Sequence, residues 1–190
     1  KYFFYMLYCK LNNRSLISFV GKDVISFLQG IITNDINKAK NDRAIYASLL
    51  SPQGKILKDF FLFKVGSKIY LDTTSESLKI LEEKLNIYKI NQEIKFSKEN
   101  FYSYYIFYGK PNNVFNLLKK EGYFKKINKT IIFNDPRKLS LGCRIICLNK
   151  NDNNKIEEII KDKKINKNDK EYNKLRIINC IPDIKKDNLY

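Results

Sequence analysis

Two neighbouring stretches decide the fold: DVISFLQGII at residues 23–32 and AIYASLLSPQGKILKDFFLFKVGSKIYLDT at residues 44–73. In the first, apolar residues recur every three or four positions, at Val24, Phe27, Leu28 and Ile31. This spacing predicts a helix with one buried face. In the second, the turn sequences Pro52-Gln-Gly54 and Gly66-Ser67 separate three β-rich runs, which predicts an antiparallel meander.

The rest of the chain alternates between the same two kinds of element. Further helices are predicted after Ser75, at residues 112–121, around Ile156 and from 169 to about 180, and further strands at residues 101–108, 130–133 and 143–148. Hairpins rather than regular βαβ units connect the strands, so we expect an α+β protein. We expect two subdomains, residues 1–98 and a second at 99–190 closely packed on the first.

The composition is strongly basic, with 36 Lys and Arg against 20 Asp and Glu and a formal net charge of +16. A polyanion such as RNA is one partner that this charge fits. The other interpretation is an A+T-rich genome, because Lys greatly outnumbers Arg and the basic residues are scattered along the whole chain. Arg is the residue that phosphate recognition favours.

The inventory of reactive side chains excludes several kinds of chemistry. The chain has no His, which removes imidazole bases and His-ligated zinc. Its four cysteines form no C-x-x-C pair, and Cys143 and Cys147 are predicted to pack as small hydrophobes on one face of a strand. We therefore predict neither a metal site nor a catalytic residue. No apolar run is long enough for a membrane span, so no membrane partner is expected.

Four motifs follow one another along the chain. They are FLQGIITNDI at 27–36, AIYASLLSPQGKILKD at 44–59, DPR at 135–137 with LG at 141–142, and YNKLRI at 172–177 with IPD at 181–183. This series resembles the YgfZ-type folate-binding proteins of the aminomethyltransferase (glycine-cleavage T-protein) superfamily. The resemblance implies antiparallel sheets with packed helices arranged around a folate pocket, and a C-terminal barrel that these 190 residues lack.

The resemblance also implies a ligand site for tetrahydrofolate or a related folate. In aminomethyltransferases, an acid of a G-x-I-x-D-D-L-I hairpin contacts the pterin, whose donor-rich edge suits a carboxylate. Asp59 occupies the position of the second acid of that motif, and Lys58 replaces the first. Tyr46 and Tyr70 are expected near the folate ring, and Asn34 and Arg176 complete the implied folate-binding set. The alternative interpretations are an exposed polar residue at Asp59 and ordinary core tyrosines.

The function that the resemblance implies is that of a folate-binding accessory protein. It would support iron–sulfur cluster assembly or repair, with iron–sulfur client or assembly proteins as partners and a link to tRNA modification. A tetrahydrofolate-dependent aminomethyltransferase is the enzymatic alternative. Ile178 stands where that enzyme family carries its second pterin-binding acid, which favours the non-catalytic factor. A basic RNA-binding module is the alternative of another class.

Two further expectations concern the extent of the chain and its compartment. The K-G-C-Y-x-G-Q-E motif of the YgfZ branch does not occur, so we expect either a fragment or a degenerate copy. The absence of a recognisable signal peptide predicts the bacterial cytoplasm, with the mitochondrial matrix as the alternative.

Overall fold

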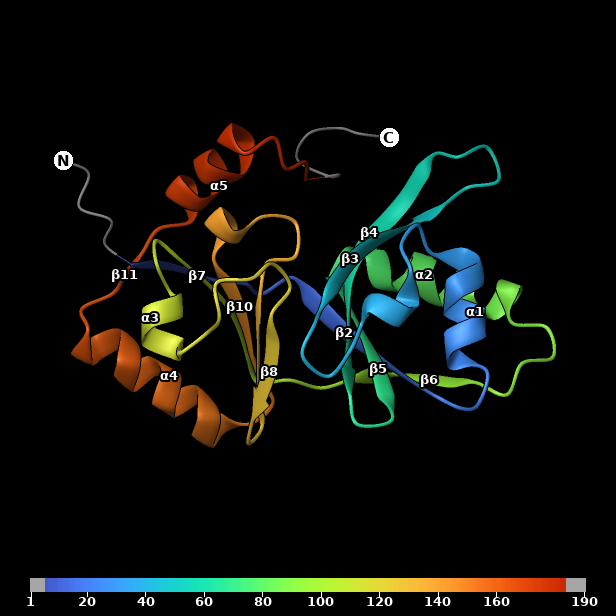
Figure 1. Cartoon of the computed structure of the whole chain (residues 1–190), viewed down its shortest axis with the longest axis horizontal. Helices are drawn as coiled ribbons and strands as arrows, with labels where there is room; N and C mark the ends of the chain where they lie inside the picture. Colours follow the sequence, from blue (N-terminus) through green and yellow to red (C-terminus); the bar gives the residue numbers. More distant parts are fainter. Residues whose placement is uncertain (1–5, 184–190) are drawn as a thin grey trace. The chain divides into compact units, whose positions relative to one another are not determined.

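The computed structural model describes residues 6–183, which fold into two compact units (Figure 1). One unit comprises residues 13–99, and the other comprises residues 6–12 together with 100–182. Each unit is built on a single β-sheet with helices. The N-terminal strand therefore belongs with the second half of the chain, whereas the sequence-based division had placed it with residues up to 98.

The unit of residues 13–99 contains a five-stranded antiparallel sheet in the order β3-β4-β5-β2-β6. Its elements are β2 (Arg14–Val20), α1 (Val24–Ile31), the 3₁₀ turn η1 (Ile36–Lys38), β3 (Ile45–Leu50), β4 (Ile56–Val65), β5 (Lys68–Thr74), α2 (Ser75–Tyr88) and β6 (Lys95–Glu99). The predicted first helix and three-stranded meander are present. Strand β6 was not predicted, because its sequence KFSKE holds only one strongly apolar residue.

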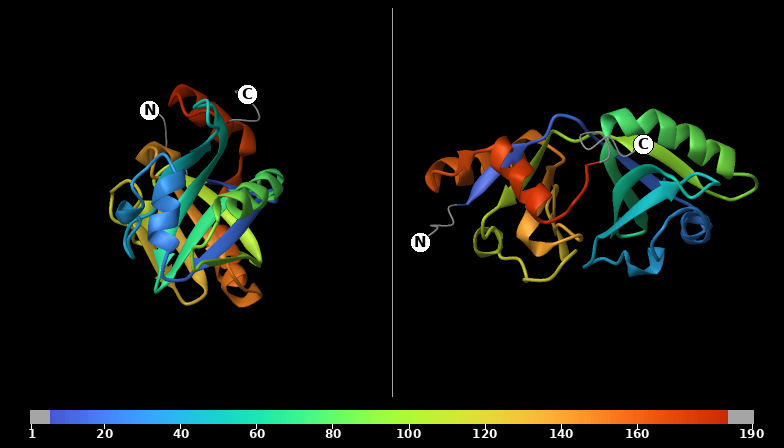
Figure 2. Two further views of the ribbon diagram at one scale, coloured as in Figure 1. Left: turned by 90° about the vertical axis from the view of Figure 1, so that its right-hand side faces the viewer. Right: turned by 90° about the horizontal axis from the view of Figure 1, so that it is seen from above.

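Both helices of this unit cover one face of the sheet (Figure 2). Phe27 and Leu28 of α1 and Leu81 and Leu85 of α2 pack on the alternate strand residues that point to that side. Side chains of a strand alternate between the two faces, so Tyr46, Asp59 and their alternate neighbours point to the opposite face. The helices therefore cover one face of the sheet, and the predicted ligand residues Tyr46 and Asp59 lie on the other face.

The other unit contains a six-stranded sheet in the order β11-β1-β7-β10-β9-β8. Its elements are β1 (Leu7–Lys10), β7 (Ser103–Tyr108), α3 (Asn112–Phe115), β8 (Phe124–Ile127), β9 (Thr130–Asn134), η2 (Leu139–Leu141), β10 (Cys143–Cys147), α4 (Lys150–Asp162), β11 (Asn166–Lys167) and α5 (Asp169–Ile178). All neighbouring strands are antiparallel except β1 and β11, which pair in parallel.

The core of the six-stranded sheet confirms the prediction for two cysteines. Cys143 and Cys147 are fully buried and lie in one apolar cluster with Phe107, Ile145 and Ile156. Burial raises the pKa of both thiols, so they remain protonated and unreactive. Within residues 6–183, no group of three acidic or sulfur side chains gathers to hold a metal ion.

Helix α3 is shorter than the sequence predicts. It ends at Phe115 rather than continuing to residue 121, because Asn116 adopts a left-handed conformation with φ 49°. Asn is one of the few residues that tolerate this conformation, which ends a helix. No helix in the described part of the chain combines the length and apolar character that a membrane crossing requires.

Candidate functional site

The carboxylate of Asp59 is the best-defined polar group among the predicted folate ligands. It lies on β4, and its Oδ2 accepts a hydrogen bond of 2.8 Å from the hydroxyl of Tyr46 on β3. Both residues are half-buried. Its Oδ1 accepts no hydrogen bond from residues 6–183, so one oxygen is fixed while the other is available to a ligand.

The strand register explains why Tyr46 reaches Asp59. Tyr46 lies opposite Phe61 and Ser48 lies opposite Asp59, so Tyr46 and Asp59 are diagonal neighbours on one face. Diagonal neighbours in an antiparallel pair are within reach of long side chains. The ring of Tyr46 also lies 5.5 Å from that of Phe61, which orients it further.

Asn34 supports the strand that carries Tyr46. Its side-chain amide donates to the backbone oxygen of Tyr46 at 2.9 Å, and its own oxygen accepts from the backbone N–H of Asp35 at 2.8 Å. The neighbouring Thr33 accepts a hydrogen bond from the backbone of Ser48 at 2.9 Å. Asn34 is thus connected to Tyr46 and Asp59, and its side chain holds the edge of the sheet in place.

Tyr70 lies on the same sheet face but takes no part in this hydrogen-bonded set. Its ring stacks on that of Phe63 at 5.6 Å with an angle of 9° between the planes. Burial raises the pKa of Tyr70, Lys68 lowers it and Glu99 raises it, with a net increase, so the hydroxyl stays protonated near neutral pH.

Arg176, the fifth predicted ligand, belongs to the other unit. It lies on α5 and is almost fully buried. Its guanidinium donates to the backbone oxygen of Ile181 at 2.8 Å and to the side chain of Asn173 at 3.1 Å. These contacts hold the chain where it leaves α5.

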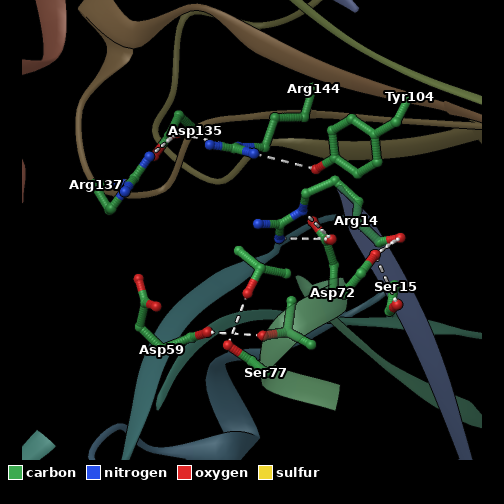
Figure 3. A network of polar contacts seen from close by, with 12 residues as sticks. Arg14, Ser15, Asp59, Asp72, Ser77, Tyr104, Asp135, Arg137 and Arg144 are labelled. Atoms are coloured by element: carbon green, nitrogen blue, oxygen red, sulfur yellow. Dashed lines mark hydrogen bonds and ion pairs between the residues drawn. The ribbon is translucent and has the colours of Figure 1, made fainter. Parts of the chain in front are cut away.

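An ion pair that the sequence analysis missed lies on the same face as Asp59. Arg14 donates from Nε at 2.9 Å and from Nη2 at 2.6 Å to the carboxylate of Asp72 (Figure 3). The guanidinium also lies 5.8 Å from the ring centre of Phe61. The sequence holds one signal for this pair, since Asp72 follows Tyr70 by two positions and so shares its face.

A second polar cluster lies within the other unit and includes the predicted DPR motif. Asp135 is fully buried and accepts hydrogen bonds from Arg137 Nε at 2.9 Å, Arg137 Nη2 at 2.7 Å and Arg144 Nε at 3.2 Å (Figure 3). Arg144 also donates to the hydroxyl of Tyr104 at 3.3 Å. Two guanidinium groups therefore share one carboxylate.

The residues around Asp59 fit one part of a folate. A pterin ring presents several N–H donors on one edge, and a carboxylate held by a neighbouring hydroxyl is a suitable acceptor for them. The oriented ring of Tyr46 offers an aromatic edge beside that acceptor. A reduced folate held there would supply one-carbon acceptor chemistry, and the chain's own residues would bind and orient it.

Comparison with known proteins finds short similar segments in two groups of curated proteins. The chain is 44% identical over 62 residues to the iron–sulfur cluster assembly factor IBA57 homolog, mitochondrial, of Aspergillus oryzae. This match covers 30% of the chain and 14% of that relative. The chain is also 38% identical over 55 residues to an aminomethyltransferase of Staphylococcus epidermidis, covering 29% of the chain and 15% of that protein. No family model matches.

A solved structure extends the similarity over most of the chain. The glycine cleavage system aminomethyltransferase T from Bartonella henselae superposes with a TM-score of 0.72 at 14% sequence identity. The match covers 86% of this chain and 47% of that protein, so the chain spans about half of that protein's length. The chain therefore has the aminomethyltransferase T-protein fold, as the resemblance predicted, and it has segments in common with the IBA57 assembly factors.

Proposed function

We propose that this chain is a folate-binding accessory protein that supports iron–sulfur cluster assembly or repair. The observation that carries the folate part is the half-buried carboxylate of Asp59, with one oxygen held by Tyr46 at 2.8 Å and the other available. The iron–sulfur part is supported by the similarity to relatives named as cluster assembly factors. The proposed partners are iron–sulfur client or assembly proteins and, through them, tRNA-modifying enzymes.

The same relatives support a mitochondrial location rather than the bacterial cytoplasm. The IBA57 homologs of Aspergillus oryzae and Neurospora crassa are both named as mitochondrial. We therefore propose the mitochondrial matrix as the compartment of this protein. Fractionation of the source cells, with the protein detected in matrix rather than cytosol, is the expected result.

The aminomethyltransferase alternative uses the same fold and the same carboxylate. It is favoured by the similarity to the Staphylococcus epidermidis enzyme. It requires transfer of the methylene carbon of a carrier-bound aminomethyl group to tetrahydrofolate, with release of ammonia, which a direct assay measures. The accessory role predicts folate binding without this transfer, so the assay separates the two proposals.

Replacing Asp59 by Asn tests the folate site. We expect the substitution to weaken binding of tetrahydrofolate by about tenfold or more, equivalent to about 1.4 kcal/mol, because an amide is a poorer acceptor than a carboxylate. Titration calorimetry with the 190-residue chain at two salt concentrations measures this change. The exposed Asp42, replaced by Asn, is the matched control and should bind as the wild type does.

Two outcomes of this titration contradict the proposal. A folded wild-type chain that does not bind tetrahydrofolate would exclude the site. Equal affinities in the Asp59→Asn and Asp42→Asn variants would place the ligand elsewhere. If the chain instead binds RNA with an affinity that falls steeply with salt and ignores Asp59, the basic RNA-binding module is the better account.

Replacing Tyr46 by Phe tests how the carboxylate is positioned. The substitution removes the hydrogen bond of 2.8 Å to Asp59 but keeps the ring. We expect folate affinity to fall by about threefold to tenfold, since a hydrogen bond to a charged group contributes about 1.5–3 kcal/mol and solvent compensates part of the loss. The control variant is Tyr102→Phe, which alters an exposed tyrosine. An equal fall in folate affinity in this control would refute a specific role for Tyr46.

A further inference from the structure

Strand β6 is an edge strand whose outer side is open. It pairs with β2 and stands last in the order of the five-stranded sheet. Within residues 6–183, the backbone of Lys95–Glu99 forms no hydrogen bonds other than those to β2. In an antiparallel pair, every second residue directs its N–H and C=O groups away from the partner strand. These groups of β6 are therefore available to a further strand.

The opposite edge of the same sheet is closed by the chain itself. The backbone N–H of Thr33 donates to the oxygen of Ser48 at 3.0 Å, and the Thr33 hydroxyl accepts from the N–H of Ser48 at 2.9 Å. Asn34 donates to the backbone oxygen of Tyr46 at 2.9 Å. The outer side of β3 is thus occupied by its own neighbours in the chain, and β6 is the edge of this sheet to which another strand can be added.

A groove with a volume of about 750 Å³ lies beside β6. Its lining comes from Glu82, Asn86 and Lys89 in and just after α2, from residues 95–97 of β6, and from Val20 at the end of β2. Helix α2 and β6 lie side by side in both views of Figure 2. Alternate side chains of an added strand would point toward the helix, and the groove provides the space for them.

One end of the groove is positively charged. Lys89 follows α2 directly and Lys95 begins β6, so both lie where a short loop connects the two elements. Neither ammonium group forms an ion pair or a hydrogen bond with the described residues. Glu93, the acidic residue of that loop, is already paired with Lys22 at 2.5 Å. The carboxylate of Glu82 lies seven residues before Lys89, about 10 Å along the helix axis.

The strand itself adds to this charge. The ammonium group of Lys98 has no ion pair in the part of the chain that the structure describes, whereas Glu99 is paired with Lys68 at 3.3 Å. Lysines on an edge strand oppose pairing between two copies of that strand, because like charges repel. The same lysines attract a strand that carries carboxylates. The charge of β6 therefore favours an acidic partner over a second copy of this chain.

We propose that β6 and the groove beside it bind an extended acidic segment of a partner protein. The segment adds a strand to the open edge through backbone hydrogen bonds, which supply affinity, while the groove selects its side chains. Its carboxylates pair with Lys89 and Lys95, and an apolar side chain packs against Phe96. An RNA would find the same lysines, but it has no alternating N–H and C=O groups to continue the sheet. The open edge therefore favours a peptide.

This docking surface is independent of the proposed folate site. Strand β6 stands at one end of the sheet order, whereas Tyr46 on β3 and Asp59 on β4 belong to the two strands at the other end. The probes that test the docking surface contain no pterin. A negative result for the peptide leaves the folate proposal standing, and the converse also holds.

Two capped heptapeptides, titrated into the full chain by calorimetry at low ionic strength, test the proposal. In the acidic peptide Val and Glu alternate, and in the basic peptide Val and Lys alternate. We expect the acidic peptide to bind at least about tenfold more tightly. In its complex, hydrogen exchange followed by mass spectrometry should slow at residues 95–99 and stay unchanged at residues 45–50, where the edge is already closed.

A third peptide separates strand addition from simple attraction of charge. It is the acidic peptide N-methylated at every residue, which keeps all carboxylates but leaves no backbone N–H to donate. We expect its affinity for the wild-type chain to be lower by about tenfold or more. Equal affinities of the methylated and unmethylated peptides would overturn the proposal, because charge would then explain the binding. This comparison needs no variant and so does not depend on the folding of one.

Reversing the charge of the groove tests the role of its lysines. The double variant Lys89→Glu/Lys95→Glu should bind the acidic peptide about tenfold more weakly and should bind the basic peptide instead. The matched control is Lys38→Glu/Lys40→Glu, which changes the net charge equally at exposed positions outside the groove. It should retain the wild-type preference for the acidic peptide.

Three further outcomes would overturn the proposal. Neither heptapeptide binding the wild-type chain would show that the edge does not accept a strand. Equal responses of the two double variants would show that only the net charge matters. A single-stranded RNA that displaces the acidic peptide, and that itself loses affinity in Lys89→Glu/Lys95→Glu, would assign the surface to nucleic acid.

Discussion

Replacing Gly142 by Ala is expected to destabilise the unit of residues 6–12 and 100–182 strongly. Gly142 precedes β10 and has φ 82° and ψ −148°, a region open essentially to glycine only. A Cβ there would collide with the backbone oxygen of Phe107 and lie 2.7 Å from Cα of Tyr108. Both atoms are backbone atoms of β7, so the collision cannot be relieved by a rotamer change.

The expected cost of Gly142→Ala is on the order of 4 kcal/mol, from backbone strain and overpacking together. Urea unfolding followed by circular dichroism measures it, since the chain has no Trp to report by fluorescence. Gly54→Ala is the matched control. It has φ 79° but no heavy atom within 4 Å of the added Cβ, so it should cost only about 1–2 kcal/mol. Equal losses in the two variants would refute the close approach of β7.

Replacing Asp135 by Asn is expected to cost about 3–5 kcal/mol at neutral pH, because it leaves two buried guanidinium groups without their carboxylate. Asp135 is 1% exposed and accepts hydrogen bonds from both Arg137 and Arg144. Denaturant unfolding measures the loss. The exposed Asp162, replaced by Asn, is the matched control and should change stability by less than about 0.5 kcal/mol.

The pH dependence of stability gives a second measure of Asp135. Burial by itself would raise the pKa of this carboxyl, but Arg137 and Arg144 outweigh burial and hold the pKa below its ordinary value of 3.8. The stabilisation is therefore complete above pH 3.8 and is lost as the pH falls through the lower pKa of the folded state. Asp135→Asn should flatten this acid limb. An acid limb that is unchanged in the variant would show that other carboxyls cause it.

Local sequence signals predicted the elements that depend on local contacts. The stripe of Val24, Phe27 and Leu28 gave helix α1, and the turn at residues 52–54 gave the hairpin of β3 and β4. The signals failed for strands that are very short or lack an alternating pattern, and that form by pairing with another strand. Strand β8 has the sequence FKKI, without alternation, and it forms because β9 lies beside it. Strand β1 is only four residues long and depends on β7, about a hundred residues away.

For the candidate site, the sequence supplied residue types but not the contacts between them. The resemblance pointed to Asp59 and Tyr46, yet it assigned Tyr46 a place beside the ring of the ligand. The structure gives the Tyr46 hydroxyl a hydrogen bond to Asp59, a contact set by the register between β3 and β4. Register depends on how strands pair, which spacing along one chain does not specify. The Arg14–Asp72 pair was missed for the same reason, because it joins two strands about sixty residues apart.

The interrupted unit has a consequence for how the chain assembles during synthesis. Strand β1 emerges from the ribosome before residues 13–99, whereas its partners β7 and β11 emerge only after them. The inserted unit can complete its own sheet in the meantime, since domains fold as units as they appear. Its first and last strands lie side by side, with Leu16 opposite Glu99. Once the unit of residues 13–99 has folded, its two ends lie close together, so β1 and β7 are no longer separated by a long flexible loop. This lowers the entropic cost of pairing β1 with β7.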